Sequence, residues 1–254
     1  MRNVAKIGVA CLAVCMMFVG CDKGEGDLNE NGSLGGNASK ITATNVINGS
    51  YRISTVKVKF YWEKGDDWGS DVIVQAPYKD NGFTLALPAT ISDKYLYLLA
   101  KDAPSGITIS DKTVKCVTDI DMEAFDKDDN NIGDFYLTDD DKSAYAMRFY
   151  VDKNVSVKGE YKEIDEVFNE EYIRKFDMDL KKGWNIVYAR EAESHNNSTG
   201  RDVYTITITT QKPSGMNFSW YFEEYYVDYS VPLKSAIALS AKKSFFTKKE
   251  IRNN

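Results

Sequence analysis

Beyond residue 40 the chain is built from short stretches in which hydrophobic and polar residues alternate or β-branched residues cluster. Asp, Asn, Gly and Lys separate these stretches, a combination typical of β-strands joined by tight turns. Residues 52–62 show the alternation, and Asn81-Gly82 predicts a tight turn before a strand at residues 83–87. The pattern therefore predicts an all-β protein.

Pairs of neighbouring stretches predict hairpins. They join residues 115–125 with 132–137, 144–151 with 155–161, 176–180 with 184–189, and 202–210 with 216–226. Strands at this density favour an antiparallel β-sandwich type of fold. The strands suit either one large sandwich or two consecutive β subdomains, and we favour two packed β subdomains. The acidic stretch that begins at Thr138 is the best boundary between them, which gives residues 41–138 and 139–254.

One segment has helical spacing. Hydrophobic residues between Ile164 and Phe176 recur at i, i+3, i+4, i+7 and i+8. This spacing predicts one short amphipathic helix over Glu163–Lys175, packed across the sheet.

The first residues follow another pattern. Arg2 and Lys6 precede an apolar run over residues 7–19, whose length suits a secretory signal and is short for a membrane span. The stretch Phe18-Val19-Gly20-Cys21 resembles the lipobox of bacterial lipoproteins, in which a small residue precedes the cysteine that receives diacylglycerol, although Phe18 stands where leucine is preferred. The resemblance implies a signal peptide over residues 1–20 and lipid on Cys21. An ordinary secreted or membrane-anchored protein with an incidental cysteine is the alternative.

After Cys21, residues 22–40 are mostly Asp, Lys, Gly, Glu, Asn and Ser, and hold too few apolar residues to fold. Residues 21–40 are therefore expected to form a lipidated, flexible, acidic tether. An acidic stretch at this place resembles the surface-export signal of Bacteroidota lipoproteins, which implies a lipid-anchored, surface-exposed protein of the outer membrane. A solvated linker that happens to be acidic is the alternative.

Charge and cysteine content exclude several function classes. The formal net charge is −6 at pH 7, and without Arg2 and Lys6 the mature chain is two units more negative. An acidic chain without a basic stripe is not expected to bind nucleic acid. Once the signal is removed and Cys21 is lipidated, Cys116 remains alone, so no intramolecular disulfide is expected. We expect Cys116 to be a small buried residue, and the single histidine, His195, to lie in an exposed loop.

One turn partly matches a calcium-binding loop. Asp126, Asp128 and Asn130 have the 1, 3, 5 spacing of an EF-hand, but Asn131 and Leu137 replace its glycine and its bidentate glutamate. A solvated hairpin turn is favoured, with weak Ca²⁺ binding as the alternative. No metal site or cofactor is predicted.

The candidate ligand-binding residues lie between residues 61 and 68. They are Trp68, Trp62, Asp66 and Asp67, since exposed aromatic rings beside carboxylates stack on sugars and hydrogen-bond to them. Trp68 lies in a polar loop and is expected to be exposed. Trp62 ends a strand and is expected to be buried, because most tryptophans belong to the core.

No catalytic constellation is visible. The chain has no phosphate loop, zinc motif or nucleophile elbow. Paired carboxylates for glycoside hydrolysis cannot be identified from the number of Asp and Glu residues alone. Trp184 and Trp220 fall within predicted strands and are expected in the core.

At Tyr150–Val155 and at the Lys-Gly-Trp-Asn turn of residues 182–185, the chain resembles uncharacterised lipoproteins of Bacteroidales, a family without an assigned reaction. The leading expectation is a non-catalytic cell-envelope lipoprotein that acts as a binding or structural module. Its expected partners are the membrane, through the lipid on Cys21, and a glycan or a protein. A glycan-binding accessory lipoprotein is the first alternative, and a glycoside hydrolase-type enzyme is the second.

Overall fold

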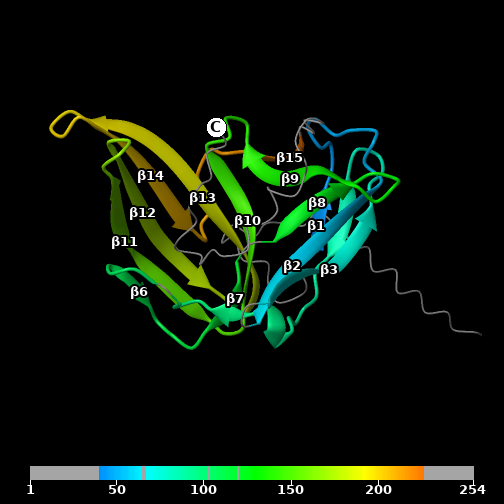
Figure 1. Cartoon of the computed structure of the whole chain (residues 1–254), viewed down its shortest axis with the longest axis horizontal. Helices are drawn as coiled ribbons and strands as arrows, with labels where there is room; N and C mark the ends of the chain where they lie inside the picture. The colour runs from blue at the N-terminus through cyan, green and yellow to red at the C-terminus, as the bar shows by residue number, and fades with distance from the viewer. Residues whose placement is uncertain (1–39, 65–66, 102, 119, 226–254) are drawn as a thin grey trace, which may run out of the picture.

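The computed structural model describes residues 40–64, 67–101, 103–118 and 120–225 (Figure 1). Within these ranges the chain forms fifteen β-strands and one short 3-10 helix, η1 (Asp93–Tyr95). The predicted all-β, sandwich-like fold is confirmed. In the described part of the chain, no helix is long and apolar enough to cross a membrane.

The strands form one small and one large sheet. In the small sheet β1 (Lys40–Ala43) pairs antiparallel with β4 (Phe83–Ala86). The large sheet has thirteen strands, and among them only β12 and β14 pair in parallel. Its first part consists of β3 (Asp67–Pro77), β2 (Thr55–Lys64), β8 (Asp121–Phe125), β9 (Asn131–Asp139) and β15 (Phe218–Glu224), which pairs with β9. Its second part consists of β10 (Ala144–Val151), β13 (Gly183–Asn196), β14 (Arg201–Thr209), β12 (Glu170–Leu180), β11 (Val155–Asp165) and β6 (Ile107–Ile109). The short strands β5 (Tyr97–Leu98) and β7 (Lys115–Val117) pair with each other, and β7 also pairs with β10.

The large sheet has two wings that meet at β10 (Figure 1). One wing holds β2, β3, β8, β9 and β15, and its inner face packs on the small sheet. The first core lies there and includes Ile41, Leu85 and Phe60. The second core belongs to the other wing and includes Phe149 and Met178.

The two cores draw on both halves of the chain. Trp184 and Trp220 lie in the first core, which confirms that they are core residues, whereas Cys116 lies in the second. Tyr150 faces the first core, and its neighbour Val151 faces the second. Residue 138 therefore does not separate the two cores, and the predicted division into residues 41–138 and 139–254 stays a prediction.

The helix predicted over Glu163–Lys175 is wrong. β11 and β12 pair through this region, from Val155 opposite Leu180 to Asp165 opposite Glu170. Asp165 Oδ1 accepts hydrogen bonds from the backbone N–H groups of Val167 and Phe168, and this turns the chain between the strands. The apparent helical spacing arises because the turn places hydrophobic residues of two strands close together in the sequence.

Of the predicted hairpins, residues 115–125 with 132–137 is confirmed by the β8–β9 pairing. The other three are wrong, because β10 pairs with β13, β11 with β12, and β15 with β9. The burial pattern of the strands explains why β10 and β11 do not pair with each other. β10 is largely buried on both faces and takes a central position, whereas β11 begins with alternating buried and half-buried residues and suits a strand with one polar face.

Candidate functional site

The four predicted ligand-binding residues do not form one group. In the β2–β3 hairpin, Trp62 lies opposite Gly69, Glu63 opposite Trp68, and Lys64 opposite Asp67. Because side chains alternate between the faces of a strand, Trp62 and Asp67 share one face and Trp68 lies on the other. Asp66 lies outside the described residues.

Trp62 packs on the inner side of the hairpin. A Cβ atom on Gly69 would lie 2.6 Å from Trp62 Cζ2, so the indole ring rests directly on the glycine backbone. Lys94 Nζ, from η1, lies 5.7 Å from the centre of the indole ring and 2.7 Å from Asp71 Oδ2. Trp62 is half-buried beside η1 and is a packing residue.

Trp68 is 49% exposed, which confirms the prediction of an exposed side chain. The face of the sheet that carries Trp68 also carries Glu63 and Tyr61 of β2. Strand register carries the face across β8, β9 and β15, since Lys57 lies opposite Glu123, Glu123 opposite Asp134, and Asp134 opposite Glu223. We name this surface the acid–tyrosine face, and it comprises Tyr61, Trp68, Asp121, Glu123, Asp134, Tyr136, Glu223 and Tyr225.

Asp134 is the central carboxylate of the acid–tyrosine face. Tyr225 donates a hydrogen bond to Asp134 Oδ2 at 2.5 Å, and Tyr136 donates one at 3.3 Å. Asp134 Oδ1 is buried and receives no hydrogen bond within the described part of the chain. Burial raises the pKa of Asp134 to about 6, and the charges of Glu123 and Glu223 act in the same direction, against the tyrosine hydrogen bonds.

The neighbouring groups keep the face negative and rich in donors. Glu123 is buried, with Lys59 Nζ at 2.5 Å from its Oε2 atom, and Lys57 forms an ion pair with Asp129. Burial raises the pKa of Tyr61, Tyr136 and Tyr225, so their phenols remain protonated donors at neutral pH. Carboxylates outnumber lysines on this face, which disfavours anionic ligands.

The acid–tyrosine face combines exposed aromatic rings with carboxylates. Trp68, Tyr136 and Tyr225 are each more than a third exposed. Tyr136 and Tyr225 donate hydrogen bonds to Asp134, and Trp68 lies opposite Glu63. Glycoside hydrolysis would need two carboxylates on either side of a bound substrate. Asp134 is a carboxylate of this face whose pKa burial raises.

Sequence patterns missed Asp134, Tyr136 and Tyr225. Asp134 and Tyr136 alternate with Phe135 and Leu137 in a predicted strand, and this signal marks them as the polar face of that strand. Tyr225, however, lies 91 residues from Asp134 in the sequence. Only the pairing of β15 with β9 brings the two side chains together.

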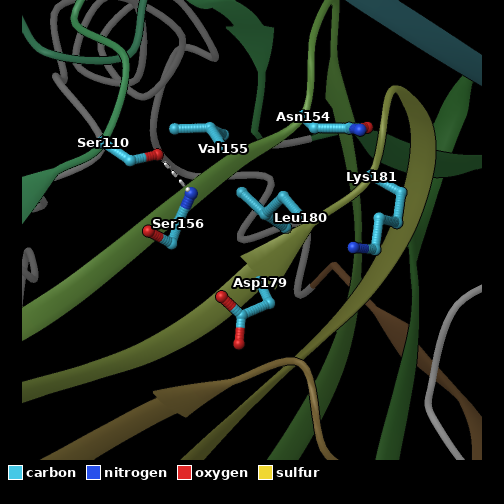
Figure 2. A pocket seen from close by; sticks show the side chains of 7 residues that line it. All are labelled: Ser110, Asn154, Val155, Ser156, Asp179, Leu180 and Lys181. Carbon is cyan, nitrogen blue, oxygen red and sulfur yellow. Dashed lines mark hydrogen bonds between the residues drawn. The ribbon is translucent and has the colours of Figure 1, made fainter.

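A shallow pocket of about 210 Å³ lies elsewhere, between the start of β11 and the end of β12 (Figure 2). Ser156 N donates to Ser110 Oγ at 2.9 Å across its rim. Asp179 and Lys181 are its only charged lining residues, and Asp179 already forms an ion pair with Lys158 at 2.9 Å. The pocket therefore offers little chemistry for acid–base work.

A second exposed surface is the β11–β12 turn. Val167 is 86% exposed and Phe168 is 68% exposed. The turn is braced by the next one along the sheet, because Asn169 Nδ2 donates to Gly200 O at 2.7 Å and Arg201 forms an ion pair with Glu166 at 2.8 Å. These contacts hold the turn in place, and we name its exposed residues Val167 and Phe168 the apolar tip.

The other candidates have local roles. Asp126 Oδ1 accepts hydrogen bonds from the backbone N–H groups of Asp128 and Asn130, so this carboxylate closes the β8–β9 turn. Within the described residues no cluster of His, Cys, Asp and Glu could hold a metal ion.

Cys116 is fully buried, as predicted, and burial raises the pKa of its thiol to about 12. His195 is exposed as expected, but it lies in β13 and not in a loop, with Nδ1 2.8 Å from Asp202 Oδ1.

Comparisons with protein families, with curated proteins and with solved structures found no match for this chain.

Proposed function

We propose that the chain is a non-catalytic lipoprotein of the outer membrane that binds glycans with its acid–tyrosine face. The observation that supports this is one sheet face on which Tyr136 and Tyr225 are exposed beside Asp134, and on which Trp68 is exposed opposite Glu63. Aromatic rings pack on the apolar faces of sugar rings, and carboxylates accept hydrogen bonds from sugar hydroxyls. An acidic face favours neutral or amine-bearing sugars over sulfated ones.

Lipid on Cys21 would hold the protein at the membrane. In this proposal residues 21–40 form the tether, and β1 begins at Lys40. A flexible chain of that length spans roughly 25 Å, enough to let the folded part turn its ligand-binding face toward the ligand. The proposed role is therefore capture of glycans close to the cell surface.

The apolar tip supports a second candidate function, the binding of a protein partner. Exposed apolar residues on a rigid support are typical of protein–protein contacts. Val167 and Phe168 are the most exposed apolar side chains of this turn, and they lie on the wing that does not carry the acid–tyrosine face (Figure 1).

The test is glycan-array binding followed by titration, using the chain from Asp22 onward, which keeps every described residue. We expect saturable binding to at least one glycan and a roughly tenfold weaker affinity for Trp68→Ala, because an aromatic stacking contact contributes about 1 kcal/mol or more. Phe168→Ala is the matched control, since it removes an exposed aromatic ring from the other wing and should leave the affinity unchanged.

Three results would contradict the proposal. Absence of binding to any glycan would reject glycan recognition, and full affinity in Trp68→Ala would reject the acid–tyrosine face as its site. A loss seen only in Phe168→Ala would transfer the binding function to the apolar tip. Thermal unfolding of each variant checks that the exposed substitutions leave the fold intact.

A further inference from the structure

The apolar tip lies at an end of its wing where four strands meet. β11 and β13 end there, and β12 and β14 begin there. Glu170 lies opposite Asp202 in the parallel pair β12–β14, so the β11–β12 and β13–β14 turns are neighbours (Figure 1). Ile164 is 47% exposed and adds a third exposed apolar side chain to this end of the wing.

This end of the wing is acidic. Residues 163–172 and 193–204 contain one arginine, Arg201, and the seven carboxylates Glu163, Asp165, Glu166, Glu170, Glu171, Glu193 and Asp202. Two basic residues beside these ranges form ion pairs into them, Lys162 with Glu171 at 3.5 Å and Arg174 with Glu163 at 4.0 Å. Seven carboxylates against three basic side chains leave a net charge of −4 around the apolar tip.

The charge around the apolar tip restricts what it can bind. An anionic lipid surface would be repelled, and so would the body of a chain whose net charge is −6. A matching partner needs apolar side chains to cover the apolar tip and basic side chains to face the carboxylates around it.

The chain itself contains a segment with this chemistry. Residues 242–252, which we name the basic segment, carry the five basic residues Lys242, Lys243, Lys248, Lys249 and Arg252. Glu250 is the one acid among them, so the basic segment has a net charge of +4. Its apolar residues are Phe245, Phe246 and Ile251. The basic segment lies outside the described residues, and its composition is complementary to that of the apolar tip and the carboxylates around it.

The apolar tip lies far from the point where the described chain ends. Tyr225 N donates to Ile132 O on β9, and from β15 to β12 the sheet crosses five strand spacings, about 24 Å. Along the strands the register adds six residues from Ile132 to Thr138 and eight from Phe176 to Phe168, roughly 45 Å.

This distance favours a second copy as the source of the basic segment. Nineteen residues, 226–244, connect Tyr225 to Phe245. A flexible chain of that length spans roughly 25 Å, so the basic segment would have to be strongly extended to reach the apolar tip of its own chain. The apolar tip of another copy carries no such constraint.

We propose that the apolar tip of one copy binds the basic segment of a second copy. Phe245 and Phe246 cover Val167 and Phe168, and the lysines of the basic segment face the carboxylates around them. Each copy carries one apolar tip and one basic segment, so copies associate head to tail. The inference rests on the second candidate function above, since it names the partner of the apolar tip, and it does not depend on glycan binding.

The test is analytical ultracentrifugation of the chain from Asp22 onward over a range of protein concentrations. The sedimentation coefficient of wild type should keep rising with concentration, because a head-to-tail contact does not close at the dimer. Association should weaken by about tenfold when NaCl is raised from about 0.05 M to about 0.5 M, because opposite charges meet in the contact.

Two variants separate the halves of the contact. Val167→Ser/Phe168→Ser removes the apolar tip, and Phe245→Ser/Phe246→Ser removes the aromatic residues of the basic segment. Each variant alone should associate at least about tenfold more weakly than wild type. A mixture of the two still holds one intact tip and one intact basic segment, so it should form a one-to-one dimer and nothing larger.

A matched control and a peptide locate the contact. Tyr51→Ser removes an aromatic side chain that is 98% exposed and should associate as wild type does. A fluorescent peptide of residues 242–254 should bind saturably to Phe245→Ser/Phe246→Ser. Adding the tip substitutions Val167→Ser/Phe168→Ser to that protein should weaken peptide binding about tenfold. Thermal unfolding of each variant checks that it is folded.

Four outcomes would overturn the inference. A monomeric wild type together with a mixture that dimerises would show that the basic segment docks on its own chain. Peptide binding that ignores the tip substitutions would place the basic segment elsewhere, and absence of both peptide binding and association would leave it without a role in contacts between copies. Photo-crosslinking from position 168 to a different protein on intact cells would reject this partner while supporting the second candidate function.

Discussion

Single residues of this protein differ in how far away their partners lie. Asp126 finds its partners two and four residues along the chain, so its role in a turn follows from local sequence. Asp134 has partners on three strands, and its burial and raised pKa follow from the assembled sheet. Both residues are aspartates in polar contexts, and only the fold gives them different chemistry.

The raised pKa of Asp134 predicts a pH dependence of stability. Its folded-state value of about 6 lies above the ordinary 3.8, so the folded chain holds the proton more tightly, and the contribution of Asp134 to stability falls as pH rises from about 4 through 6. The variant Asp134→Asn should not lose stability in this way, because an asparagine side chain has no proton to release over this pH range. Between pH 4 and pH 7, urea unfolding should show wild type losing about 1–3 kcal/mol relative to Asp134→Asn.

A second variant on the acid–tyrosine face checks the cause. The charge of Glu223 raises the pKa of Asp134, so Glu223→Gln should shrink the pH-dependent difference without abolishing it, since burial remains the larger cause. Parallel stability curves for wild type and Asp134→Asn across this pH range would contradict the assignment.

At the scale of elements, the Lys-Gly-Trp-Asn turn has a structural explanation. Gly183 has a φ of +97°, which suits glycine, and Trp184 is buried with Nε1 donating to Pro88 O at 2.8 Å. Asn185 is buried and holds the turn, since its Nδ2 donates to Lys181 O at 2.7 Å and to Gly183 O at 3.0 Å, while its Oδ1 accepts from Lys181 N at 2.8 Å. The motif supports a fold and not a reaction.

Asn185→Leu should therefore be strongly destabilising. The substitution leaves the buried backbone groups of the turn unpaired, at an expected cost of about 2–4 kcal/mol. Asn196→Leu is the control at the other end of β13, where the side chain closes an exposed turn and its loss should cost under about 1 kcal/mol. Urea midpoints measure both, and equal losses would contradict the role assigned to Asn185.

At the scale of the whole molecule, two cores share β10, and the chain crosses between them several times. Residues from 41 to 222 contribute to the first core, so neither half of the chain can complete that core without the other. The proposed lipid anchor, Cys21, lies outside the described residues, and the lipoprotein proposal gives a prediction that is independent of the two cores.

Cys21→Ser should release the protein from the membrane fraction and abolish labelling by an alkyne-bearing palmitate analogue, because the thiol that accepts the lipid is lost. Cys116→Ala is the control and should keep both properties, since that thiol is fully buried. Label and membrane association that persist in Cys21→Ser would reject lipidation at this residue.

Local sequence patterns were enough to predict the all-β class, the confirmed β8–β9 hairpin, the exposure of Trp68 and the burial of Cys116, because alternation and turn chemistry depend on residues only a few positions apart. Tertiary structure alone decided which strands pair, turned the expected helix into the end of a hairpin, and separated Trp62 from Trp68. Backbone hydrogen bonds do not discriminate between partner strands, so pairing is decided by which faces become buried. The acid–tyrosine face exists only after that choice, since it combines side chains from strands far apart in the sequence.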